Sequence, residues 1–278
     1  MKMQFGFSDL CINLPENKSE LQEILFKLHK VGYRNVVINQ NVDESVFENE
    51  KKKKKKAGTV NTCPYCIPKP FNIQDLEMEF TGKLNIFNRI TFTFSDPLKT
   101  HSINQLAMMK NYDLYAVIPK TQNAFQFACA QLNVDVIFIN STCKGLKLSR
   151  KLYLQAVERG IHFEIQYSDV INLSTRKLAI HYSHLFYTFG KSKNVVLSSG
   201  ANSDSLIRNP YDIINLARLL GLNETNAKNA LGSNTISALL KGEGRRSGKS
   251  FFKIHRTEKV DDDVDLSNIP SKKIKLCD

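Results

Sequence analysis

Short apolar runs alternate with helical patterns along the chain from residue 5 to about residue 240. Several runs are nearly continuous in Val, Ile and Phe, as in VDVIFIN at 134–140 and NVVL at 194–197. Strands of a parallel sheet are buried on both faces, so they need apolar residues at successive positions rather than at alternate ones. The pattern predicts seven strands, at Phe5–Ile12, Asn35–Asn39, Arg89–Phe94, Asp113–Ile118, Val134–Asn140, His162–Tyr167 and Asn194–Ser198.

Helical segments lie between the predicted strands. Ser149–Arg159 and Pro210–Leu220 carry apolar residues at helical spacing, and a glycine that can end a helix follows each of them. Asn209 provides an N-cap before Pro210, which suits the first helical position. An earlier helix is predicted from an apolar stripe at Leu21, Ile24, Leu25 and Leu28.

Strands that alternate with helices are joined by right-handed crossovers, which leaves an open doubly wound sheet or a closed barrel. The length of 278 residues and the seven strands favour the barrel. No eighth strand is evident, and Asn223–Leu240 has a helical pattern. We therefore expect an α/β fold, a TIM-like (β/α) barrel with seven clear strands and a helical C-terminal end.

Two stretches fall outside this alternation. Residues 41–83 hold a lysine run, Lys51–Lys56, and several prolines, and we interpret them as an insertion after the second strand. The predicted barrel domain spans 1–242, and the polar residues 243–278 are expected to form a disordered tail. PSKKIKL at 270–276 resembles a nuclear-import signal, although short basic stretches also occur by chance.

The formal net charge of +12 favours an anionic partner. Lys51–Lys56 supply six of these charges, and Lys241–Asp278 add three through ten basic and seven acidic residues. The rest of the chain is only mildly basic, so the charge favours nucleic acid without locating the surface that binds it. No apolar stretch approaches the roughly 20 residues of a membrane span, and we expect a soluble intracellular protein with no membrane partner.

Cys63 and Cys66 form CPYC, which has the spacing of a redox centre or of half a zinc site. Pro68 and Pro70 would disrupt the helix that follows a redox CxxC. A structural zinc site needs four ligands, and no second Cys or Cys/His pair is present. A solvated loop is the favoured interpretation, with metal or intermolecular pairing and redox chemistry as weaker alternatives.

Motifs that carry catalysis in α/β enzymes are absent from the sequence. There is no G-x-S-x-G, GEGRRSGK at 242–249 lacks the P-loop spacing, and SSGA at 198–201 has a single glycine. Metal-dependent barrel hydrolases commonly carry histidines after their first strand, where FSDL at 7–10 stands here. We therefore predict no catalytic residue, no metal and no cofactor.

One alternative of another class stays open, a free-standing metal-dependent phosphoesterase. Its metal site would use Asp9, Glu164, Asp169 and one histidine. His181 and His184 alone have a spacing that places two histidines on one helical face. The favoured interpretation is that both are ordinary helix residues.

Basic residues remain as candidates for chemistry, because phosphate contacts need only Lys, Arg, exposed amides and helix N-termini. Each group of them alone is typical of a solvated face. Together, on a chain without a catalytic site, they favour RNA binding as part of a scaffold. The candidate RNA-binding residues are Arg176 and Lys177 after the sixth strand, Arg208 before the NPYD helix, and Arg245, Arg246 and Lys249 after the last helix.

Several motifs occur in an order that resembles the ribonuclease P protein component 3 family, the barrel subunit shared by nuclear ribonuclease P and ribonuclease MRP. They are FSDLCI at 7–12, YDLYAVIPK at 112–120, RGIHFEIQYS at 159–168, and VVLSSGA at 195–201 followed by RNPYD at 208–212. Any one of them alone is weak, but their combination is specific, and the resemblance covers most of residues 5–240.

The resemblance implies a barrel related to PHP metal-dependent phosphoesterases but without their metal ligands. It also implies a non-catalytic subunit that stabilises the catalytic RNA for removal of the 5′ leader from precursor tRNA, and for rRNA processing in the MRP form. The implied partners are that RNA, precursor tRNA within the complex, a small α/β partner subunit and other ribonuclease P proteins. The implied location is the nucleus and the nucleolus. The lysine run and CPYC depart from the family pattern.

Overall fold

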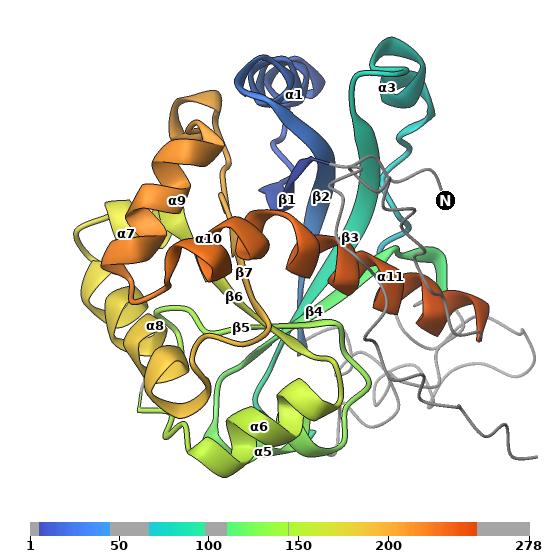
Figure 1. The fold of residues 1–278 in the computed structure, drawn as a ribbon. Coiled ribbons are helices and arrows are strands. Elements are labelled where there is room, and N and C mark those ends of the chain that lie inside the picture. Colours follow the sequence, from blue (N-terminus) through green and yellow to red (C-terminus); the bar gives the residue numbers. More distant parts are fainter. Residues whose placement is uncertain (1–5, 45–66, 98–109, 144, 249–278) are drawn as a thin grey trace, which may run out of the picture.

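The computed structural model describes residues 6–44, 67–97, 110–143 and 145–248, and these form one parallel barrel (Figure 1). Seven strands pair in chain order, each parallel to the next, which confirms the predicted fold class. The strands are β1 (Phe7–Asn13), β2 (Tyr33–Asp43), β3 (Asn85–Phe94), β4 (Leu114–Pro119), β5 (Val136–Phe138), β6 (His162–Gln166) and β7 (Val195–Ser198).

Helices follow the strands and cover the outside of the barrel. Thr121, Ser149 and Asn209 cap three of them, since each side chain accepts a hydrogen bond from a backbone N–H of the first turn. The helices are α1 (Lys18–Val31), α3 (Gln74–Glu79), α5 (Gln122–Ala130), α6 (Arg150–Glu158), α7 (Tyr167–Ile171), α8 (Arg176–Gly190), α9 (Pro210–Leu219), α10 (Glu224–Leu231) and α11 (Ser233–Ser247), with a 3-10 turn at Asp204–Leu206.

The barrel nearly closes between β1 and the residues that follow β7. Ile12 bridges Ala201, the Asn13 amide donates to the Ala201 carbonyl at 2.8 Å, and the Gly200 amide donates to the Cys11 carbonyl at 2.9 Å. Gly200 has a φ of +62°, and a Cβ there would lie 2.3 Å from Oε1 of Gln166, so the turn that makes this contact requires glycine.

After α9 the chain continues with two more helices, and the second of them, α11, lies at the amino ends of the strands. Figure 1 shows α10 and α11 following one another across the barrel. Lys241 donates to the carbonyl of Val134 at 2.7 Å, and Gly242 packs against the carbonyl of Asp113, so α11 lies at the starts of β4 and β5. Ala238 and Leu239 enter the barrel and pack on apolar residues at the amino end of its interior: Leu10, Val37, Phe87, Leu114, Ala116, Val136 and Val196.

The interior changes from apolar to polar toward the carboxyl ends of the strands. Residues two apart on a strand point to the same side, so β3 turns Phe87, Arg89, Thr91 and Thr93 inward in succession. The other strands follow the same order, with Val37 before Asn39 on β2 and Val196 before Ser198 on β7. The barrel is therefore packed at one end and hydrophilic at the other.

Several predicted boundaries are corrected by the structure. β2 continues to Asp43 and β3 begins at Asn85, four residues before the predicted start, because the two strands pair from Asn35 with Asn85 to Asp43 with Thr93. The predicted insertion at 41–83 therefore overlaps a strand, and it also contains α3. α11 runs to Ser247 rather than ending near residue 242, because its last turn is held by ion pairs to the barrel.

The lysine run, CPYC, Lys249 and PSKKIKL lie outside the described residues. Among the residues that the structure describes, no helix has both the length and the apolar character to cross a membrane.

Candidate nucleic-acid interface at the carboxyl end of the barrel

A buried ion pair lies inside the barrel, between β3 and β6. Arg89 donates to both carboxylate oxygens of Glu164, each at 2.6 Å, and neither side chain is exposed. Arg89 also donates to the carbonyl of Leu10 and to Oγ1 of Thr91, both at 2.9 Å, and Ser198 donates to Glu164 at 2.7 Å. A buried pair is tolerated when such hydrogen bonds satisfy it. The pair leaves the interior without a net charge from these two groups.

Asp9 on β1 is a second buried carboxylate, and it belongs to the seam between β1 and β7. Its Oδ1 accepts from the amides of Cys11 at 3.2 Å and Ser199 at 3.0 Å, whereas Oδ2 has no partner in the described part of the chain. Burial raises its pKa to about 6, against an ordinary 3.8. Asp9 therefore acts as a hydrogen-bond acceptor that holds the seam.

The residues of the phosphoesterase alternative are not gathered as metal ligands. Glu164 is taken by Arg89, and Asp9 uses Oδ1 for two backbone amides. His181 and His184 are exposed on α8, outside the barrel. His162 is buried at the start of β6, and burial lowers its pKa to about 4. Within the described ranges, no group of three or more His, Cys, Asp and Glu could hold a metal ion.

The mouth at the carboxyl ends of the strands is a cavity of about 260 Å³ with a polar lining. Residues after the strands of an α/β barrel meet at this end, where such folds place their sites. Its walls include Asn39 on β2, Thr93 on β3, Asn140 after β5 and Gln166 on β6, with Asp169 on α7. Burial raises the pKa of Asp169. The mouth thus offers amides, hydroxyls and one carboxyl group.

Around the mouth, the described residues of the connections after β4 to β7 include seven basic ones, which we call the basic rim. The Gln122 side chain joins two of these connections through the backbone of Lys147: its Nε2 donates to the Lys147 carbonyl at 3.1 Å, and its Oε1 accepts from the Lys147 N–H at 2.8 Å. None of the seven forms an ion pair with a carboxylate in the described residues, and six are exposed. The basic rim consists of Lys120, Lys147, Arg150, Lys151, Arg176, Lys177 and Arg208.

The basic rim also gathers helix N-termini. α5, α6 and α9 begin there after β4, β5 and β7, and α8 begins there after the short helix α7 that follows β6. Their first-turn N–H groups and dipoles add partial positive charge, which favours anions such as phosphate. This half of the carboxyl end can therefore bind a polyanion through groups that keep their charge near neutral pH.

The structure separates the predicted RNA-binding residues into two places. Arg176, Lys177 and Arg208 lie on the basic rim and are exposed. Arg176 donates to the carbonyls of Val170 and Ile171 at 2.8 and 2.7 Å, which fixes its position at the end of α7.

Arg245 and Arg246 lie at the opposite end of the barrel. Arg245 pairs with the fully buried carboxylate of Asp135 at 3.0 Å, and Arg246 pairs with Asp113. Both guanidinium groups are therefore engaged in holding α11 on the barrel. Lys249 lies outside the described residues.

Sequence reasoning missed Lys120, Lys147, Arg150 and Lys151 as members of this surface. The available signal was position: Lys120 and Lys147 lie between a predicted strand and the following helix, and Arg150 and Lys151 lie in the first turn of α6, which in an α/β barrel means the carboxyl end.

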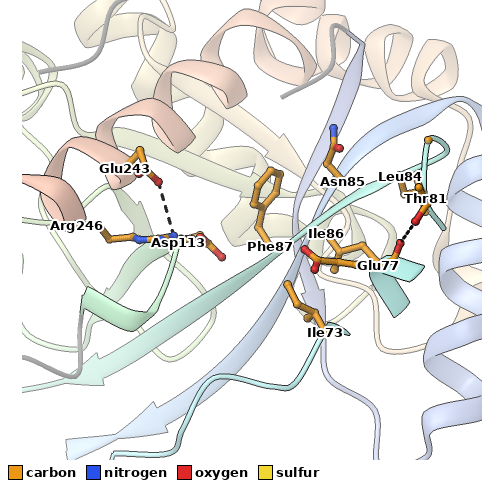
Figure 2. A pocket seen from close by; sticks show the side chains of 11 residues that line it. Ile73, Glu77, Thr81, Leu84, Asn85, Ile86, Phe87, Asp113, Glu243 and Arg246 are labelled. Carbon is orange, nitrogen blue, oxygen red and sulfur yellow. Dashed lines mark hydrogen bonds and ion pairs between the residues drawn. The ribbon is translucent and has the colours of Figure 1, made fainter. Parts of the chain in front are cut away.

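A larger cleft of about 720 Å³ lies at the other end, between α3, the start of β3 and α11. Figure 2 shows Phe87, Ile86 and Ile73 in its middle, Glu77 near α3, and Asp113, Glu243 and Arg246 on the α11 side. Three carboxylates against one guanidinium make its lining acidic, so this cleft does not suit phosphate.

Comparisons with known proteins identify relatives of this chain. A family model described as RNase P subunit p30 matches residues 6–247. The mouse protein "Ribonuclease P protein subunit p30" is 30% identical over 264 residues, covering 93% of this chain and 95% of that protein. The Saccharomyces cerevisiae "Ribonuclease P/MRP protein subunit RPP1" is 26% identical over 250 residues, covering 85% and 80%.

Among solved structures, a chain in an archaeal ribonuclease P with mature tRNA superposes with a TM-score of 0.62 at 13% identity. The match covers 92% of this chain and all of that chain, and at this identity it shows a shared fold. The similarity to the mouse and yeast proteins and the family model, which matches nearly the whole barrel, indicate the same family. The chain belongs to the RNase P subunit p30 family.

Proposed function

We propose that the protein is a non-catalytic subunit of the ribonuclease P and ribonuclease MRP ribonucleoproteins. The observation that carries this proposal is the family match across residues 6–247, the whole described barrel. In this role the protein stabilises the catalytic RNA that removes the 5′ leader from precursor tRNA, and it serves rRNA processing in the MRP form.

The basic rim is the proposed RNA-binding surface. Lysine and arginine stay charged near neutral pH, and arginine can bind a phosphate through two hydrogen bonds. Seven such residues without carboxylate partners in the described chain, next to four helix N-termini, can neutralise several phosphates of a folded RNA. The protein would therefore favour an RNA conformation in which phosphates come close together.

The buried carboxylates support a role without protein-based catalysis. Glu164 is neutralised by Arg89, and Asp9 accepts two backbone hydrogen bonds in the barrel seam. In the proposed complex, the chemistry belongs to the RNA.

Further partners are part of the same proposal. They are the catalytic RNA itself, precursor tRNA within the complex, a small α/β partner subunit and other ribonuclease P proteins. A protein with these partners is expected in the nucleus, including the nucleolus.

Affinity purification of the full chain from its own cells tests the proposal. We expect a small structured RNA in the eluate, and cleavage of precursor tRNA that ribonuclease treatment of the eluate abolishes. Turnover of a phosphoester by the purified protein alone, lost in Asp9→Asn, would instead support the phosphoesterase alternative and overturn the proposal.

A further inference from the structure

We propose that the mouth of the barrel binds the base of one unpaired nucleotide, while the basic rim holds the phosphates on either side of it. The inference rests on the proposed RNA-binding role of the rim. It adds a site inside the barrel that recognises a base rather than a charge.

The first support is the set of unused hydrogen-bonding groups in the mouth. Oδ1 of Asn140 accepts from the amide of Thr142 at 3.0 Å and from its hydroxyl at 2.6 Å, which fixes the side chain. The Nδ2 group of Asn140 is left without a partner in the described chain, as are the hydroxyls of Thr93 and Ser141. An amide and two hydroxyls around one cavity can pair with the donors and acceptors on the edge of a base.

The second support is that hydrogen bonds hold the lining in place before any ligand arrives. Asn39 donates to Oδ1 of Asn13 at 2.9 Å and to Oδ1 of Asn41 at 3.0 Å, and it accepts from Thr91 at 2.5 Å. Thr91 in turn accepts from Arg89 of the buried ion pair. Polar groups fixed in this way lose little conformational freedom when a ligand binds.

The third support is the charge inside the mouth. Arg89 is neutralised by Glu164 below the cavity, and the charged group that lines the cavity among the described residues is Asp169. A phosphate would meet a carboxylate there and no cation, so an anionic group is disfavoured. The cations of the basic rim lie outside the mouth, where phosphates can stay in solvent.

The shape and the apolar part of the lining fit a single base. Ile118 and Phe138 line the cavity at the ends of β4 and β5, and Phe138 offers an aromatic ring. The volume of about 260 Å³ is below that of pockets for drug-sized ligands, which start at roughly 300 Å³. Unpaired bases are commonly recognised through their edges together with contacts to aromatic side chains.

The test compares two matched variants of the full-length protein. Asn140→Asp keeps the oxygen that accepts from Thr142 and replaces the free amide with a charged acceptor. Asn172 accepts from the amide and hydroxyl of Ser174 in the same way, at 3.1 and 3.0 Å, but it lies between α7 and α8 and does not line the mouth. Asn172→Asp therefore adds the same charge near the rim without changing the cavity.

The probes are the four free nucleosides and ribose, followed by NMR, and a short unstructured RNA with or without one abasic position. At least one nucleoside should shift signals of mouth residues, ribose should not, and the abasic RNA should bind more weakly than the intact RNA. Asn140→Asp should weaken nucleoside binding by roughly tenfold, the effect of one ordinary hydrogen bond, and Asn172→Asp should leave it unchanged.

The outcomes separate this inference from the proposed function. If no nucleoside perturbs the mouth, or if both variants behave alike, base recognition is overturned. Salt-dependent RNA binding that ignores the abasic position would overturn base recognition and leave the role of the rim intact. Nucleoside binding in the mouth without any RNA binding would support base recognition and contradict the proposed role of the basic rim.

Discussion

Arg89 and Glu164 join opposite sides of the barrel through two parallel hydrogen bonds of 2.6 Å, with both side chains fully buried. The pair lies between the apolar layer that α11 completes and the polar mouth. Through Thr91 and Asn39, its hydrogen bonds continue into the lining of the mouth. The stability of the barrel and the order of the candidate site thus depend on the same residues.

Replacing Arg89 with Met should lower the free energy of unfolding by about 3–5 kcal/mol, because Glu164 would remain buried without its partner. Denaturation in guanidinium chloride would measure the loss. The double variant Arg89→Met with Glu164→Leu should recover much of it. Lys228→Ala, which breaks the exposed pair with Glu224, serves as a control and should have little effect. Equal effects of Arg89→Met and Lys228→Ala would contradict the prediction.

Asp9→Asn should stabilise the protein at neutral pH. The folded-state pKa of about 6 lies above the ordinary 3.8, so the stability linked to protonated Asp9 is complete below 3.8 and is lost as pH rises through about 6. The loss amounts to about 3 kcal/mol. Asn removes the titration and keeps the oxygen that accepts from Cys11 and Ser199.

Unfolding measurements between pH 4 and pH 8 would test the Asp9 prediction. The difference between the wild type and Asp9→Asn should be small at the acidic limit and largest above pH 6. His162 has its pKa lowered to about 4, so its contribution is present above 6.5 and is lost as pH falls, which opposes that of Asp9. Comparing the two proteins isolates Asp9, and parallel pH profiles would show that its pKa is not raised.

Removing three charges from the basic rim should reduce the salt dependence of RNA binding. The variant Lys147→Ala, Arg150→Ala, Lys151→Ala should lower the slope of log K against log salt by about 2 if each residue contacts one phosphate of single-stranded RNA. Lys30, Lys83 and Lys193 are also exposed but lie at the amino end of the barrel, so their triple Ala variant is the matched control. Identical slopes in the two triple variants would place the contacts elsewhere.

Arg245→Ala should act on stability rather than on RNA binding. Asp135 is fully buried and would lose its ion pair, at a cost of about 3 kcal/mol. The salt dependence of RNA binding should stay that of the wild type. A smaller salt dependence of RNA binding with unchanged stability would instead show that Arg245 contacts RNA.

The parallel barrel could be predicted from the sequence because continuous apolar runs such as VDVIFIN leave few other folds for a buried strand. The extension of α11 past Gly242 could not be predicted, since GEGRRS is polar and rich in glycine. Its helix is stabilised by Asp113 and Asp135, which precede β4 and β5 and lie more than 100 residues away in the chain. Long-range ion pairs of this kind leave no local pattern.

Part of the candidate site could be predicted from the position of basic residues after the strands. Arg176, Lys177 and Arg208 follow predicted strands, and the same rule of position applies to Lys120 and Lys147. The pairing of Arg89 with Glu164 depends on which faces of β3 and β6 meet across the barrel. That relationship appears only when the strands are assembled.

The position of α11 determines when the barrel can finish folding during synthesis. Leu10 on the first strand packs in the same interior layer as Leu239, which the ribosome adds almost 230 residues later. A nascent chain that ends before α11 would expose the amino end of the barrel, and such surfaces attract chaperones or aggregate. The interior can be completed only after α11 has left the ribosome. Assembly with RNA should therefore follow translation rather than accompany it.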